Sequence, residues 1–216
     1  MQDRVCALVT AVDDAVAHSL PEECAKMLRD IIFRTHLDVF RRTLLGDPPA
    51  RVEPMTVRIQ PGAKALRAKP RASPAKTACL HEHMTNLEIA GMVFRNPQAI
   101  YGSAAMAIPK GFNYYGMVTN YRAVNDTIEP AAVPMPNLED KASLFAGATA
   151  WCTLDMLEGY WQVPLSEDAQ EMFTMVTPEG LFTLRRVSPG VLNATGYFQA
   201  TMGDVLDGYI DKIFLV

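Results

Sequence analysis

The clearest chemical signal in the sequence is the segment Cys152-Thr-Leu-Asp155-Met-Leu-Glu-Gly-Tyr160-Trp-Gln162. We expect residues 150–154 to form a short apolar strand that ends at Asp155. A carboxylate at the end of a buried strand is costly unless its charge is compensated. Mg²⁺ provides such compensation and takes one or two carboxylates together with phosphate oxygens. Tyr160 follows beyond a glycine, where the chain can turn back toward the carboxylate. The alternative is a solvated Asp155 in a turn, with Tyr160 and Trp161 as core residues.

The composition is that of a folded protein, with 216 residues, 49% of them hydrophobic and 20% charged. It excludes wholesale disorder and fits one large domain or one and a half. No run approaches the ~18 apolar residues of a membrane span. Asp13 and Asp14 interrupt the apolar N-terminus, which argues against a secretory signal. The four cysteines are widely spaced and include no CxxC pair, which argues against a zinc site and favours a reduced, intracellular protein.

Charge is distributed unevenly around a net charge of −4. Residues 51–76 hold seven basic side chains and one acid, whereas residues 151–216 hold nine acids and three bases. The basic segment could neutralise nucleic-acid phosphates. It contains no interleaved aromatic residue of the kind that single-strand binding uses for stacking, so we favour an extended structural connector.

The coarse pattern predicts a mixed α+β chain in which antiparallel hairpins pack with helices. Ser19 and Pro21 suggest a helix start, and 47–72 is rich in proline and extended, with a short strand at 55–59. The expected helices are 19–45, 73–91, 138–146 and 193–206. The expected hairpins pair 103–108 with 115–124 and 173–176 with 181–184, and a further strand begins at 212–216.

Four stretches of the sequence, in order, resemble the reverse transcriptase of gypsy-class LTR retrotransposons. The similarity covers roughly residues 52–216, and four ordered blocks are far more specific than any one of them. The blocks are Gly91-Met-Val-Phe-Arg-Asn-Pro97 through Ala107-Ile-Pro-Lys110; Asn120-Tyr-Arg-Ala-Val-Asn125 with Pro134-Met-Pro136; Leu154-Asp155-Met-Leu-Glu-Gly-Tyr160-Trp-Gln162; and Val187-Ser-Pro-Gly190-Val-Leu-Asn193-Ala194 with Phe198-Gln199.

The resemblance implies a partial right-hand polymerase fold, with fingers and an incomplete palm. Its expected parts are an N-terminal helical segment (1–50), a basic connector (51–72), mostly fingers (73–147) and a partial palm (148–216). Asp155 and the backbone carbonyl of Met156 would help to hold two Mg²⁺ ions roughly 3.5–4 Å apart. The remaining implied site residues are Lys110, Tyr160 and Gly190 for the nucleotide, with Tyr160 excluding a 2′-hydroxyl, and Arg122, Asn125 and Gln199 for nucleic acid.

The chain also departs from the family pattern. The family's aromatic-x-Asp-Asp pair would fall at about 219 and 220, so we expect the chain to be truncated before it. Gly116 stands where the family has an arginine that contacts the triphosphate. Asn120 replaces an aspartate, and Pro189 replaces a phenylalanine or glutamine.

These features predict a fragment of a retroelement reverse transcriptase that is inactive alone. The parent reaction would be template-directed DNA synthesis by two-metal nucleotidyl transfer. The implied partners are an RNA or DNA primer–template, a dNTP and the remainder of a polyprotein, with no membrane. Two alternatives stay open: a non-catalytic remnant that binds nucleic acid or protein, and a pseudogene product without function.

Overall fold

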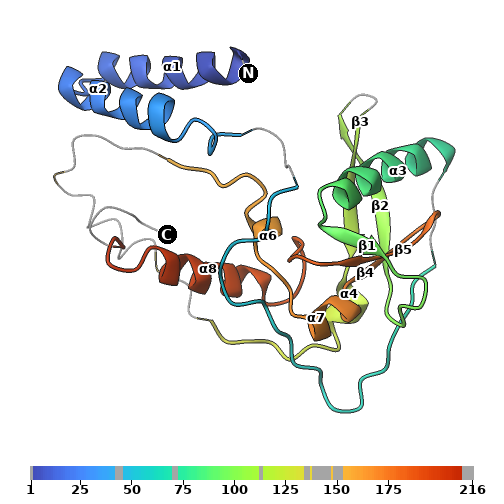
Figure 1. Cartoon of the computed structure of the whole chain (residues 1–216). Coiled ribbons are helices and arrows are strands. Elements are labelled where there is room, and N and C mark those ends of the chain that lie inside the picture. The colour runs from blue at the N-terminus through green and yellow to red at the C-terminus, as the bar shows by residue number, and fades with distance from the viewer. Residues whose placement is uncertain are drawn as a thin grey trace. The chain divides into compact units, whose positions relative to one another are not determined.

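The computed structural model of the chain describes residues 2–41, 46–69, 73–111, 114–133, 137, 147 and 153–210. The chain divides into two compact units. The first comprises Met1–Leu44 and Ala142–Leu157, and the second comprises Leu45–Lys141 and Glu158–Val216. Each unit has its own elements, which are labelled in Figure 1.

The first unit contains a helical hairpin, α1 (Gln2–Ala17) and α2 (Glu22–Asp30), and a π-helical turn, η1 (Ile31–Thr35), that continues α2. Its core is Val12, Ala25 and Ile32. The predicted helix over 19–45 is therefore too long, and Ser19 does not begin it. Ser19 has a φ of +80° and ends α1 instead, because the Leu20 N–H donates to the Ala15 carbonyl at 2.9 Å.

The second unit is organised around a five-stranded sheet in the order β1-β5-β4-β2-β3. All neighbouring strands are antiparallel except β4 and β2, which are parallel. Both predicted hairpins are confirmed, and they lie in this one sheet. The strands are β1 (Val93–Arg95), β2 (Ser103–Gly111), β3 (Tyr114–Asn120), β4 (Thr174–Thr177) and β5 (Gly180–Leu184).

The return strand of the first hairpin is shorter than predicted. It ends at Asn120, and Arg122–Asn125 forms the short helix α4. The Asn120 side-chain oxygen accepts a hydrogen bond from the Arg122 N–H at 3.1 Å. An asparagine that binds the backbone two residues on favours a turn over a continued strand, which explains the break.

The helix α3 (Pro74–Ile89) covers one face of β2 and β3 (Figure 1). Its predicted start at Ser73-Pro74 is confirmed, and Gly91, with a φ of +68°, follows its end. Leu80 packs with Ala105 and Ala107 of β2 in a buried cluster. The same face carries the partly buried Tyr115 and Met117 from β3, so the alternation along both strands matches a half-covered sheet.

The connector 46–69 is extended, as predicted, and touches the rest of its unit through isolated bridges. Met55 pairs with Leu165, Ile59 with Ile128 and Arg67 with Gly102. Met55 is only 1% exposed, so the connector contributes to the core. The guanidinium of Arg186 also holds it, because Arg186 is buried and donates to the carbonyls of Asp47 and Trp161.

Three further helices complete the described residues: α6 (Gly159–Gln162), α7 (Glu167–Met172) and α8 (Ala194–Val205). The start of α8 agrees with the predicted helix at 193. The predicted helix at 138–146 and strand at 212–216 lie outside the described residues. Among the helices that are described, none is long and apolar enough to cross a membrane. The fold is thus the expected α+β mixture of hairpins and helices.

Candidate nucleotide and nucleic-acid interface

Tyr160 lies on α6 and leans against α8. Its hydroxyl is 3.2 Å from Oγ1 of Thr195, and its ring centroid is 5.2 Å from that of Phe198. The preceding Glu158 has a φ of +48°, so the chain does turn sharply just before Tyr160. The ring is half-buried rather than fully in the core, which leaves part of its surface available to a ligand.

Gly190 lies at the tip of an irregular segment, residues 187–193, which we call the Gly190 loop. It is exposed and has a φ of +90°, a conformation that L side chains rarely adopt. A Cβ at this position would lie 3.7 Å from the ring of Tyr121. The loop therefore passes close over Tyr121, and a glycine there permits both the turn and the approach.

Asn125, at the end of α4, holds the Gly190 loop. Its Nδ2 donates to the Gly190 carbonyl at 2.9 Å, and its Oδ1 accepts from the Leu192 N–H at 3.0 Å. The structure thus brings together two predicted site residues that are 65 positions apart. Both polar ends of the Asn125 amide are engaged with backbone, whereas its predicted contact with nucleic acid stays a prediction.

Tyr121 is the buried centre of this region. Its ring meets that of Phe173 edge-on, with centroids 5.8 Å apart. Its hydroxyl is buried and has no hydrogen-bond partner of acceptable geometry among the described residues, although the hydroxyls of Ser188 and Thr119 lie nearby. Burial raises the pKa of Tyr121 to about 12.

The other predicted contacts lie on accessible surface of the same unit. Arg122 is exposed on the first turn of α4, and Gln199 is half-buried on α8. Lys110 is exposed near the end of β2, where its side chain runs across Gly116 of β3. A Cβ on Gly116 would come within 2.4 Å of Lys110 Cε, so the lysine occupies the space that a side chain at 116 would need.

The prediction that Asp155 ends a buried strand is wrong for residues 153–156, which are the part of this segment that the structure describes. Residues 153–156 form no regular structure and are exposed, with Leu154 64% accessible, while 150–152 lie outside the described residues. Among the described residues, Leu154 lies outside every strand and its side chain stays exposed, so the expected burial fails there. Asp155 and Met156 belong to the first unit, so the structure does not relate their positions to Tyr160 or Gly190.

The Mg²⁺ prediction can be tested only against the donors present. Among the described residues, no three His, Cys, Asp or Glu side chains gather in a way that could hold a metal ion. Asp155 offers one exposed carboxylate, and two Mg²⁺ ions need more ligands than that. The described residues alone therefore do not fit the two-metal site.

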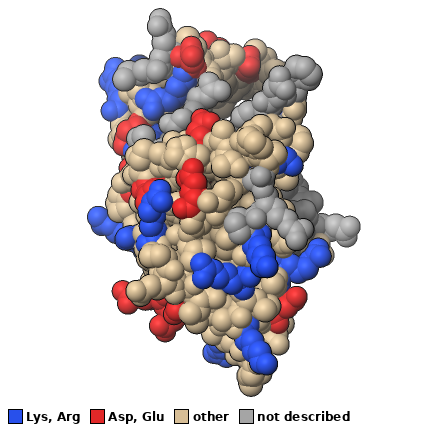
Figure 2. Space-filling view, turned by 90° about the vertical axis from the view of Figure 1, so that its right-hand side faces the viewer, with Lys and Arg blue, Asp and Glu red and all other residues tan. Residues whose placement is uncertain are grey.

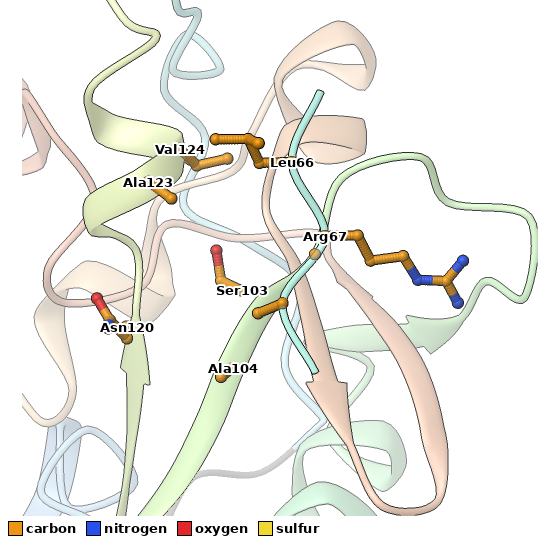
Figure 3. Close-up of a pocket in the computed structure, with 9 residues that line it drawn as sticks. Leu66, Arg67, Ser103, Ala104, Asn120, Ala123 and Val124 are labelled. Atoms are coloured by element: carbon orange, nitrogen blue, oxygen red, sulfur yellow. The ribbon is translucent and has the colours of Figure 1, made fainter. Parts of the chain in front are cut away.

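A cavity of about 240 Å³ lies between the connector, the start of β2 and α4 (Figure 3). Leu66 and Val124 give it apolar walls, while Ser103 and Asn120 bring polar side chains to it. The side chain of Arg67 extends away from the cavity in Figure 3. The cavity is mainly apolar with a few polar groups, and it is smaller than most pockets that bind drug-sized ligands.

The basic connector presents its charges to solvent. On the face shown in Figure 2, Lys and Arg side chains lie across the middle, with Asp and Glu side chains both among them and around them. The exposed basic side chains of the connector are Arg51, Arg58, Lys64, Arg67 and Lys69. Arg71 lies outside the described residues. Exposure alone fits both interpretations of the connector, solvated spacer and phosphate contact.

Comparison with known proteins identifies the family. No model of a known protein family matches the chain. It is 33% identical over 100 residues to an RNA-directed DNA polymerase homolog of Oenothera berteroana, a match that covers 46% of the chain and 70% of that protein. The chain belongs to the reverse transcriptase family. This reverse transcriptase chain is also 32% identical over 100 residues (46% of its length) to the enzymatic polyprotein of figwort mosaic virus, and 28% identical over 130 residues (57%) to the Pol polyprotein of the Drosophila melanogaster transposon gypsy. It spans only 15% and 13% of those two polyproteins.

Solved structures show the same fold. The reverse transcriptase chain matches the protease–reverse transcriptase of prototype foamy virus with a TM-score of 0.73 at 20% identity, over 92% of this chain and 27% of that one. It also matches a foamy viral protease–reverse transcriptase in complex with double-stranded DNA, with a TM-score of 0.71 at 18% identity, over 96% and 42%. The mixed α/β fold is therefore that of the fingers and palm region, as the sequence predicted.

Sequence reasoning missed three residues that organise this surface: Tyr121, Arg186 and Asn193. Tyr121 and Asn193 stand inside matched blocks, so the blocks pointed to them without indicating a structural role. Arg186 gave no signal, because a buried arginine is recognised only by the carbonyl groups that the fold places around it.

Proposed function

We propose that the chain provides the fingers and part of the palm of a gypsy-like reverse transcriptase, and that the parent reaction is template-directed DNA synthesis. The observation that carries this proposal is that residues from different matched blocks contact one another in the second unit. Asn125 of one block binds Gly190 of another, and Tyr160 of a third contacts α8, which carries Gln199. Distant blocks that meet on one surface are expected where they serve one ligand.

Each predicted site residue has a proposed role on this surface. Lys110 contacts the triphosphate as a cation, and the half-buried ring of Tyr160 packs beneath the sugar and rejects a 2′-hydroxyl. Gly190 and Gln199 line the nucleotide and template, while Arg122 and Asn125 lie toward the nucleic-acid backbone. Asp155, with the Met156 carbonyl, is proposed as a Mg²⁺ ligand. Bound Mg²⁺ would neutralise phosphate charge, although the described residues do not complete its site.

The domain boundaries are also a proposal: a helical segment at 1–50, a basic connector at 51–72, fingers mostly at 73–147 and palm mostly at 148–216. The covering of β2 and β3 by α3 supports a coherent fingers part. Residues 174–184 pair with this same sheet, so the proposed fingers and palm ranges share a core rather than folding separately.

The proposed partners are an RNA or DNA primer–template, a dNTP and the rest of a polyprotein. The exposed basic connector supports a nucleic-acid partner. The foamy viral protein of the same fold is itself seen with double-stranded DNA. We also propose an intracellular setting, which the free thiols of Cys6, Cys24 and Cys79 favour.

The second candidate is a binding protein without catalysis, still derived from a reverse transcriptase. The replacement of an arginine by Gly116 favours it, because a glycine has no charged side chain for a bidentate phosphate contact and Lys110 fills the space. In this candidate the connector and α4 bind nucleic acid, while nucleotide selection is lost.

The first experiment measures binding of a fluorescent primer–template to the full chain by anisotropy. Arg122→Ala should weaken binding about threefold to tenfold, since a charge-assisted phosphate contact is worth about 1 kcal/mol at an accessible site. Arg34→Ala removes an exposed arginine from the first unit and serves as the matched control. Equal affinities for both variants would contradict a nucleic-acid surface at α4.

A further inference from the structure

Two asparagines from different matched blocks tie the same pair of segments together. The first, Asn125, binds the Gly190 loop with both ends of its side-chain amide. Since one end donates to a carbonyl and the other accepts from an N–H, the side chain stands in for a peptide group of a neighbouring strand. It gives an irregular loop the two hydrogen bonds that regular structure would otherwise supply.

The second, Asn193, binds in the opposite direction. It ends the Gly190 loop, and its amide reaches back to the segment that follows α4. Its Nδ2 donates to the Glu129 carbonyl at 2.9 Å, and its Oδ1 accepts from the Ala131 N–H at 2.9 Å. The two asparagines thus form a reciprocal clamp of four hydrogen bonds between residues 125–131 and 190–193.

The loop needs such a clamp because its backbone is unusual. Gly190 and Asn193 both have positive φ, +90° and +69°. Its start is anchored where the Val187 N–H donates to Val163 at 3.0 Å. Besides the clamp, two backbone turns hold its later part: the Val191 N–H donates to the Ser188 carbonyl at 3.3 Å, and the Ala194 N–H donates to the Val191 carbonyl at 3.2 Å. Positive φ values persist where surrounding contacts over-determine them.

The clamp also fixes the start of α8. Asn193 is the N-cap position of α8, yet its side chain makes no capping bond to the helix, because it is engaged with 129 and 131. One turn further on, Gly196 packs against Val133 so closely that a Cβ would lie 2.7 Å from Val133 Cβ. The loop, the first turn of α8 and residues 129–133 are therefore packed and hydrogen-bonded to one another.

We propose that Asn125 and Asn193 are positioning residues that lock the Gly190 loop and α8 in the arrangement that receives a nucleotide. They would act through Gly190, and through α8 on Tyr160 and Gln199, without themselves touching the nucleotide. This inference rests on the proposed function. It gives both asparagines the same role, which is to hold the Gly190 loop and α8 in place. Neighbouring residues, rather than the two asparagines, contact the nucleotide.

Replacing either clamp asparagine by aspartate tests the clamp, because an aspartate carboxylate has nearly the same size and shape as the amide but cannot donate a hydrogen bond. Asn125→Asp keeps the size and the acceptor but loses the donor, and sets a carboxylate against the Gly190 carbonyl. Asn193→Asp does the same against the Glu129 carbonyl. Asn86 is exposed on α3, so Asn86→Asp adds the same charge to the same unit away from the clamp and is the matched control.

The experiment has two readouts on the full chain. The first is the affinity of a Mg²⁺–dNTP for the chain bound to a dideoxy-terminated primer–template. Each clamp variant should weaken dNTP binding about tenfold, the loss of one well-placed hydrogen bond plus an unpaired carbonyl. In Asn193→Asp, whose asparagine has no proposed contact with nucleic acid, primer–template affinity should stay within about twofold. The second is hydrogen exchange, in which 187–196 and 126–133 should lose protection together. Asn86→Asp should change neither.

The outcomes separate the clamp from the proposed function. Wild-type dNTP affinity in both clamp variants would overturn the positioning role. Loss of protection in the loop alone, with 126–133 unchanged, would overturn the reciprocal clamp. If the wild-type chain itself bound no dNTP, the proposed function would fail, and the clamp as a coupling of two segments would be judged by exchange.

Discussion

At the residue scale, the surface depends on side chains that serve the backbone as much as on those that could touch a ligand. Asn125 and Gly190 occur in different blocks of the sequence, and the fold turns them into one contact. Tyr121, between two residues with polar side chains in the sequence, is instead the buried support of the Gly190 loop. Its role follows from packing and is expected to show in stability.

We predict that Tyr121→Phe leaves the free energy of unfolding at pH 7 unchanged or raises it by up to about 1 kcal/mol. The change removes a buried hydroxyl with no well-formed partner among the described residues, and it keeps the ring contact with Phe173. Urea unfolding followed by circular dichroism measures the effect. A loss of more than about 1 kcal/mol would show that the hydroxyl is hydrogen-bonded after all.

The same residue predicts a dependence on alkaline pH. Burial raises the Tyr121 pKa to about 12 in the folded chain, against about 10 unfolded, so between these values the folded state binds the extra proton. Below pH 10 this titration leaves the free energy of unfolding unchanged. Between pH 10 and 12 it lowers the free energy of unfolding by up to about 1.4 kcal/mol per pH unit. Tyr121→Phe should flatten this part of the stability profile, whereas Tyr209→Phe, at an exposed tyrosine, should leave it unchanged.

At the scale of elements, the sequence predicted the helices and hairpins whose ends are set by local residues. It failed where contacts between distant residues set the end or the burial of an element. The helix expected from residue 73 has a proline in its first turn, and the hairpin expected between 173–176 and 181–184 has a proline and a glycine between its strands. Both have local start or turn signals, and both are confirmed. The end of β3 at Asn120 depends on one side-chain bond, which periodicity does not reveal. The strand expected at 150–154 was inferred from a short apolar run, which does not show whether neighbouring strands are there to bury it.

The candidate site was predictable to a similar degree. The motif blocks contain Tyr160, Gly190 and Asn125, and all three residues belong to the second unit of the structure. They could not indicate that Asn193 reaches back to residue 131, because that contact spans 62 positions and depends on a left-handed residue. Nor could they indicate that Lys110 would lie across Gly116, since the strand register sets that approach.

Helix α8 offers a prediction with an internal control. Gly196→Ala should destabilise the chain by about 1 kcal/mol, because the overpacking against Val133 exceeds the gain in helix propensity. Gly203 lies on the same helix, and outside its own stretch of helix no atom of the described residues lies within 4 Å of where its Cβ would stand. Gly203→Ala should therefore stabilise the chain by up to about 1 kcal/mol. Thermal unfolding of the two variants measures the difference. Equal melting temperatures would contradict the close packing of α8 on 129–133.

At the scale of the whole molecule, the charge of the chain is concentrated rather than evenly spread. The net charge is −4, yet the exposed bases of the connector are gathered over a short stretch of chain. A nucleic acid approaching the chain responds to that local charge more than to the total, because salt screens charges beyond about 10 Å.

If the connector contacts phosphates, removing its charges should reduce the salt dependence of binding. Lys64, Arg67 and Lys69 together changed to Ala should lower the slope of log affinity against log salt by about 0.9 for each phosphate that is no longer neutralised. Anisotropy titrations with duplex DNA at several salt concentrations give the slope. Changing Lys26 and Arg34 to Ala in the first unit is the control, and an unaltered slope in the triple variant would leave the connector as a spacer.

We further predict that the 216-residue chain by itself does not extend a primer. The four matched blocks supply one family metal carboxylate, Asp155, and electrostatic stabilisation by metals carries most of phosphoryl transfer. A primed homopolymer with Mg²⁺ or Mn²⁺ and dNTP is the assay, and Asp155→Ala sets the background. Extension above that background would refute the prediction and show that other carboxylates complete the site.

The central claim is that this surface belongs to a template-directed polymerase, and its most direct test is nucleotide selection by the template base. The full chain is bound to a dideoxy-terminated primer–template, and each of the four dNTPs is added with Mg²⁺. We predict that the complementary dNTP, at about ten times its dissociation constant, raises primer–template affinity about tenfold, and that the other three do not. The same response to all four dNTPs, or to none, would contradict the claim and leave a nucleic-acid-binding protein without nucleotide selection.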